Sequence, residues 1–199
     1  MKKILLIFSI MITMLSCSGC VMLLTEKDKT TNISDYSKYL GQDGKHNNDI
    51  FPYIIPNSAK TQEFCYYYYN PFDPNYVSYL VYSCNDEDYM KETDRLSELH
   101  SSKDYLIYGA TGFNYPVCAV YADSYKGYIY ALADKDNNRL IYVEINFCNY
   151  FSDINYENII KKKYLPIDFN AKSGNPTRRA FEEGKLTKSN EQYSFVVMQ

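Results

Sequence analysis

The clearest pattern in the chain is a series of three short apolar runs separated by turn-forming residues. The runs cover 117–122, 128–133 and 140–147, and each is rich in β-branched and aromatic residues. Asp, Asn, Ser and Gly, which favour turns, occupy most of 124–127 and 134–138. This spacing predicts an antiparallel meander of three strands, on which we expect the other elements to pack.

The second turn sets the register of this meander. If Ala133 pairs with Leu140, alternate side chains of the last two strands share a face of the sheet. One face is then nearly all aliphatic and aromatic and includes Val143 and Ile145, whereas the other contains alanines, Tyr142 and Glu144. The first face is the expected packing surface for a helix, and Leu96 is expected to be buried against it.

Further strands and one helix are predicted before the meander. Runs 63–69 and 77–84 have strand composition, and the link 70–75, with two prolines, makes them a hairpin. Residues 86–99 have apolar positions at helical spacing, with Asn85 as N-cap and three acids in the first turn. One more strand is predicted at residues 104–108. Short helices are expected within 34–40, capped by Ser34, and within 152–163.

The N-terminus has the order of a secretory leader. Lys2 and Lys3 precede an uncharged apolar run, 4–15, which is followed by Cys17, Ser18, Gly19 and Cys20. Ser18-Gly19-Cys20 resembles the lipobox of bacterial lipoproteins, in which small residues precede the cysteine that receives diacylglycerol. The resemblance implies that Cys20 is lipidated and that the chain is anchored at the extracytoplasmic face of the cell membrane.

The leader also allows other arrangements. The resemblance departs from the lipoprotein pattern at Cys17, where Leu is usual, and Cys17 is itself a second candidate acceptor with the bulky Leu15 two residues before it. Residues 4–24 carry no charge, so this run also has the length of an uncleaved transmembrane anchor. In either case Lys2 and Lys3 hold the short N-terminus inside. Full release of the chain is a third possibility.

These patterns predict an α+β fold, in which a hairpin plus a three- to four-strand meander forms an antiparallel sheet with one main helix packed on one face. We expect a lipoprotein signal peptide at 1–20, a spacer at 21–59, the α+β domain at 60–169 and a weakly ordered tail at 170–199. The assigned spacer is polar and interrupted by prolines and glycines, although Tyr36, Tyr39 and Leu40 are placed to dock on the domain.

Composition narrows the classes of function. Hydrophobic residues make up 46% of the 199 residues, which is enough for a core. The formal net charge is -3, and without Lys2 and Lys3 the chain has 19 Lys and Arg against 24 Asp and Glu. No basic patch dominates, so nucleic acid is excluded as the main ligand.

Candidate metal and catalytic residues are few, and we predict no cofactor, metal or catalytic site. Asp134, Asp136 and Asn138 match the first three ligand positions of an EF-hand loop, but Arg139 replaces its glycine and the final glutamate is missing, so an acidic hairpin turn is expected. His100 follows the predicted helix, where a cation suits the carbonyl end. A hydrolase using His100 with a serine or an acid is one alternative function.

Four cysteines follow the leader, namely Cys65, Cys84, Cys118 and Cys148. An even number in an exported chain favours disulfides, but no Cys-x-x-Cys pair indicates zinc. In the meander Cys118 and Cys148 would lie roughly 26 Å apart, too far for a bridge. A bridge between Cys65 and Cys84 stays open, and buried free thiols are the favoured interpretation.

The chain contains 23 tyrosines and no tryptophan. Tyrosine can form a recognition surface, although strand propensity explains the same excess. The domain loosely resembles small surface lipoproteins of Gram-positive bacteria with Tyr-rich strands, a likeness that implies no activity. We therefore predict a binding or interaction module, more a binder than an enzyme, whose partner is an extracellular protein or a cell-wall glycan. An inhibitor or immunity-type lipoprotein is the other alternative.

Overall fold

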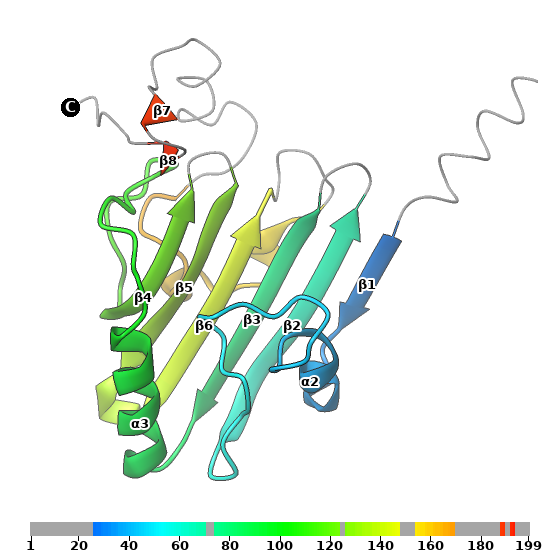
Figure 1. Ribbon diagram of the computed structural model, residues 1–199, viewed down its shortest axis with the longest axis vertical. Helices are drawn as coiled ribbons and strands as arrows, with labels where there is room; N and C mark the ends of the chain where they lie inside the picture. Colours follow the sequence, from blue (N-terminus) through cyan, green and yellow to red (C-terminus); the bar gives the residue numbers. More distant parts are fainter. Residues whose placement is uncertain are drawn as a thin grey trace, which may run out of the picture.

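The computed structural model describes residues 26–70, 74–123, 126–147 and 154–169, and two short paired strands, β7 (Lys188–Ser189) and β8 (Gln192–Tyr193). Its main element is a six-stranded antiparallel sheet in the order β1-β2-β3-β6-β5-β4 (Figure 1). The predicted leader with Cys20, Cys148 and most of the predicted tail lie outside the described residues. The strands of the sheet are β1 (Glu26–Thr30), β2 (Lys60–Asn70), β3 (Asn75–Ser83), β4 (Val117–Asp123), β5 (Gly127–Asp134) and β6 (Arg139–Asn146).

The helical elements are short, so the described chain is mostly antiparallel sheet with some helix. The longest helix, α3, begins where predicted, because the Asn85 side chain accepts the Asp88 N–H at 2.8 Å. The first short helix begins earlier than predicted, because Asn32 rather than Ser34 caps it. Two 3-10 turns replace the helix expected within 152–163. The helical elements are η1 (Ile33–Asp35), α2 (Tyr36–Tyr39), α3 (Asp86–Ser97), η2 (Lys135–Asn137), η3 (Tyr156–Asn158) and η4 (Lys162–Tyr164).

The hairpin and the three-strand meander are confirmed, including the pairing of Ala133 with Leu140. The strand predicted at 104–108 is wrong, since these residues form an irregular segment. Tyr108 has a left-handed backbone with φ 54°, and the Ile107 N–H donates to the Tyr128 hydroxyl at 3.0 Å instead of to a neighbouring strand.

The sheet has a core on each face. The back face carries the predicted aliphatic and aromatic side chains, including Val143 and Ile145, and buries them under residues from the 105–115 and 154–169 segments. The front face, which carries α2 and α3 in Figure 1, is packed with α3 and residues from 33–59. Its buried residues are Tyr36, Tyr39, Leu40, Ile50, Phe51, Phe64, Tyr66, Tyr68, Leu80, Tyr82, Tyr89, Leu96, Ala119, Ala131, Ala133, Leu140 and Tyr142.

The predicted packing of Leu96 against Val143 and Ile145 is therefore wrong. Leu96 is fully buried, but in the front core with Ala131 and Ala133. Small side chains allow a helix to approach the strands closely, whereas the larger side chains of the back face are covered by irregular chain.

The predicted spacer at 21–59 is also wrong for residues 26–59, which belong to the fold. β1 pairs with β2 over five residues and forms one edge of the sheet. Tyr36, Leu40 and Phe51 are buried in the front core. A few large apolar side chains anchor this mostly polar segment, and that burial outweighs its polar composition.

Serines cover the other edge of the sheet. The Val120 N–H donates to the Ser101 hydroxyl at 3.2 Å, and the Ala122 N–H donates to the Ser102 hydroxyl at 2.9 Å. The Ser102 N–H in turn donates to the Val120 carbonyl at 2.7 Å. The residues after α3 thus supply hydrogen-bond partners to β4 without forming a seventh strand.

Candidate functional site

A polar cleft of about 470 Å³ opens at one end of the sheet, where β2 begins and β3 ends. At the opposite end, Asn70 of β2 pairs with Glu26, the first residue of β1. Lys60 and Asn70 are separated by roughly 33 Å along the strand. The cleft is therefore far from the point at which the chain enters the sheet. It is lined by Ser58, Lys60, Ser83, Cys84, Asn85, Asp136, Asn137 and Asn138.

Hydrogen bonds hold the walls of this cleft. The Ser58 hydroxyl donates to Asp88 of α3 and accepts the Asn85 N–H at 3.3 Å. On the other wall, Asn138 adopts a left-handed backbone with φ 43°, and its side-chain amide donates to Asp86. The β2 start, the α3 N-terminus and the β5–β6 turn are thus tied together, so the cleft is formed in advance of any ligand.

The cleft offers hydrogen-bonding and charged groups. Lys60 and Asp136 are exposed, and neither makes an ion pair within the part of the chain that the structure describes. Burial raises the pKa of the Cys84 thiol to about 11, so that thiol is protonated at neutral pH and is a poor nucleophile. The arrangement is suited to hold a polar ligand through hydrogen bonds rather than to carry out covalent chemistry.

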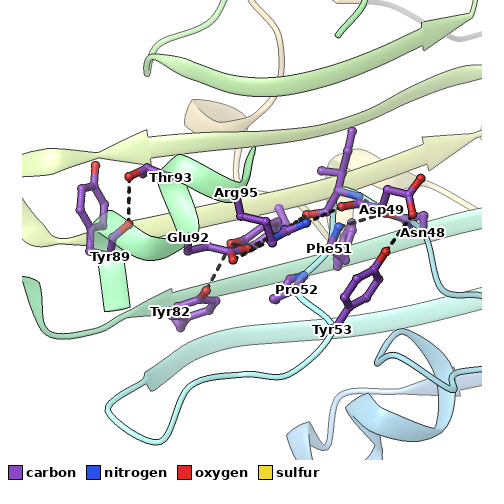
Figure 2. A network of polar contacts seen from close by, with 12 residues as sticks. Asn48, Asp49, Phe51, Pro52, Tyr53, Tyr82, Tyr89, Glu92, Thr93 and Arg95 are labelled. Atoms are coloured by element: carbon purple, nitrogen blue, oxygen red, sulfur yellow. Dashed lines mark hydrogen bonds and ion pairs between the residues drawn. The ribbon is translucent and has the colours of Figure 1, made fainter. Parts of the chain in front are cut away.

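A second polar cluster joins α3 to the 48–53 segment (Figure 2). Arg95 forms two hydrogen bonds with the Glu92 carboxylate, at 2.8 and 2.7 Å, and donates to the carbonyls of Asp49 and Ile50 at 2.6 and 2.9 Å. The Tyr142 hydroxyl, whose pKa burial raises well above its usual value, also donates to Glu92, at 2.7 Å. These groups satisfy one another, which is typical of a structural network.

A third cluster contains His46 and Glu144. His46 contacts the Tyr66 hydroxyl through Nδ1, and burial lowers its pKa. Glu144 is only 6% exposed and accepts a hydrogen bond from the Ser78 hydroxyl at 2.7 Å. Burial raises the pKa of Glu144 to about 7. Because Ser78 is bonded directly to the acid and His46 to a tyrosine, the order serine–histidine–acid needed to activate a nucleophile is not formed.

The structure places the residues singled out by sequence apart from one another. His100 is exposed, and within the described ranges it forms no hydrogen bond with a serine or an acid. Asp134 pairs with Arg139 and accepts from the Asn137 amide, so the expected acidic turn is confirmed. No group of His, Cys, Asp or Glu suited to a metal ion occurs among the described residues.

The described cysteines Cys65, Cys84 and Cys118 are free thiols. The disulfide between Cys65 and Cys84, which the sequence left as an alternative, is therefore not formed. Cys148, for which no bridge to Cys118 was expected, and the predicted lipidation site Cys20 lie outside the described residues. In the described part of the chain, no helix has the length and apolar character to cross a bilayer.

Most described tyrosines form the cores rather than a recognition surface. Their hydroxyls bond inward: Tyr36 donates to the Pro52 carbonyl at 2.5 Å, and Tyr130 to the Tyr164 carbonyl at 2.8 Å. Within the described ranges, the exposed tyrosines are Tyr53, in the segment between α2 and β2, and Tyr121 of β4. The tyrosine excess is therefore structural here, as strand propensity predicts.

Sequence reasoning missed the cleft, because three separate segments form it. The helix cap at Asn85 and the turn at 134–138 were each predicted from the sequence. Only the folding of the sheet brings the two to the same end of the sheet. Comparison with protein-family models, curated proteins and solved structures gave no match.

Proposed function

We propose that this protein is a membrane-tethered extracytoplasmic lipoprotein that acts as a binding module. Its anchor is a lipid on Cys20, its body is an α+β domain with α3 as the main helix, and its ligand site is the polar cleft. The observation that carries the proposal is the position of β1: it starts at Glu26, close behind Cys20, and the cleft lies at the other end of the sheet.

The tether and the sheet together set the geometry. Six residue steps separate Cys20 from Glu26, so the start of β1 lies at most about 22 Å from the lipidated cysteine and stays near the bilayer. The cleft lies roughly 33 Å farther along β2, at the end of the sheet away from the tether. The sheet itself thus acts as the stand-off that a long spacer was expected to provide.

The lining of the cleft suits a polar partner, either a cell-wall glycan or a polar loop of an extracellular protein. Its hydroxyl, amide, ammonium and carboxylate groups match ligands rich in hydrogen-bonding groups. A hydrolase using His100 has no such support, because no described serine or acid is bonded to that side chain.

The anchor is tested by growing cells with a clickable fatty acid. We expect Cys20→Ala to abolish labelling and Cys17→Ala to retain it. Labelling of Cys20→Ala at the wild-type level would contradict the assignment.

The cleft is tested by sedimentation with purified cell walls, with and without their bound proteins. We expect Lys60→Ser/Asp136→Ser to weaken binding at least tenfold. Lys91→Ser/Asp43→Ser makes the same change at exposed positions elsewhere and should bind normally. Binding that survives removal of wall proteins indicates a glycan, and binding that is lost indicates a protein. Equal binding by both variants would refute the role of the cleft.

A further inference from the structure

The acidic and the basic side chains of β1 lie on opposite sides of the sheet. Glu26 and Asp28 point to the front of the sheet, where both pair with Lys45. Lys27 and Lys29 alternate with them and therefore point to the back. The two acids and the two lysines of β1 therefore lie on opposite sides of the sheet.

The two lysines lie over tyrosine rings of β2. The Lys27 ammonium is 5.4 Å from the centre of the Tyr67 ring and 5.8 Å from that of Tyr69, and the Lys29 ammonium is 5.2 Å from Tyr67. Both lysines are exposed, and both tyrosines are half-buried. We call these four residues the lysine–tyrosine corner. It lies at the end of the sheet where the chain enters.

We propose that the lysine–tyrosine corner docks on the surface of an anionic lipid bilayer. This inference rests on the proposed anchor at Cys20, which holds Lys27 within about 25 Å of the lipidated cysteine. Lysines near an anionic leaflet are attracted to it, and tyrosine rings favour the interfacial region. Docking would convert a loose tether into a defined orientation, and the cleft, farther along β2, would stay open.

The absence of tryptophan from the chain allows a single-site reporter. Tyr69→Trp places an indole in the corner, with Tyr67→Trp as a second reporter if the first variant folds poorly. Tyr53→Trp, at a 42% exposed position beside α2, is the reference reporter. The lipidated full chain is reconstituted into vesicles containing brominated phosphatidylcholine, either alone or mixed with phosphatidylglycerol, and the quenching of tryptophan fluorescence is measured.

We expect strong quenching of the corner reporter in vesicles with phosphatidylglycerol, little in neutral vesicles, and little at position 53 in either. Adding Lys27→Gln/Lys29→Gln should lower the ratio of docked to undocked protein about 30-fold, the effect of two lysines at such a surface. Lys91→Gln/Lys103→Gln removes the same charge elsewhere and should leave that ratio unchanged.

Two failures are distinguishable. Protein that does not float with the vesicles and carries no lipid would overturn the anchor and with it the proposed function. Protein that floats, but whose corner reporter is quenched no more than position 53 or is insensitive to Lys27→Gln/Lys29→Gln, would overturn the docking inference alone.

Discussion

Glu144 gives a quantitative test of the front core. Its carboxyl is buried in the sheet, where the Ser78 hydroxyl is its hydrogen-bond donor. Burial raises the pKa from 4.5 to about 7, because the charged form loses its hydration. Replacement by glutamine keeps the size of the side chain and an oxygen that can accept from Ser78, but removes the charge.

The sign follows from proton binding. The folded protein holds the Glu144 proton more tightly than the unfolded chain, so this group favours folding fully below pH 4.5. That contribution falls as the pH rises from 4.5 to about 7 and is lost above it. Raising this pKa from 4.5 to about 7 corresponds to about 3 kcal/mol of unfolding free energy. The Glu144→Gln variant has no carboxyl at this site, so its unfolding free energy should not show this decrease with rising pH.

Urea unfolding of the wild type and of Glu144→Gln at several pH values measures this effect. The difference between their unfolding free energies should move in favour of the variant by roughly 2–3 kcal/mol between pH 5 and pH 8. Glu98→Gln, at the exposed position directly after α3, is the control and should show no such trend. A difference for Glu144→Gln that does not change with pH would refute burial of an ionisable carboxyl at this site.

Two further substitutions test the packing of α3. Leu96→Ala should lower the unfolding free energy by about 3–5 kcal/mol in urea melts, because Leu96 is fully buried, whereas Met90→Ala, at a 60% exposed position of the same helix, should cost under about 1 kcal/mol. Arg95→Ala should cost about 2–3 kcal/mol and increase amide hydrogen exchange in 48–53, because it removes the bonds to Asp49 and Ile50. Unchanged exchange there would mean that Arg95 does not hold the segment.

The local elements were predictable where the signal lies within a few neighbouring residues. The turn at 134–138 fixed the pairing of Ala133 with Leu140, and the cap at Asn85 fixed the start of α3. The side of the sheet that α3 covers was not predictable in this way. Both faces are apolar enough to be buried, and the choice depends on side-chain volume in three dimensions, where alanines of β4 and β5 leave room for a helix.

The role of residues 26–59 was missed for a related reason. β1 has no apolar run, because four of its five residues are charged, and its place in the sheet comes from pairing with β2. The cleft escaped prediction for the same reason, since its lining residues come together only when the strands pair. Long-range pairing of this kind leaves little trace in local composition.

The serine hydroxyls along β4 decide how this sheet behaves toward other copies of itself. An exposed edge strand offers unpaired N–H and C=O groups, on which a second sheet can continue the ladder. Both groups of Val120 and the N–H of Ala122 are already bonded to Ser101 and Ser102, which belong to an irregular segment with no regular ladder of its own to extend. Even where many copies are crowded together, this edge is therefore closed to polymerisation.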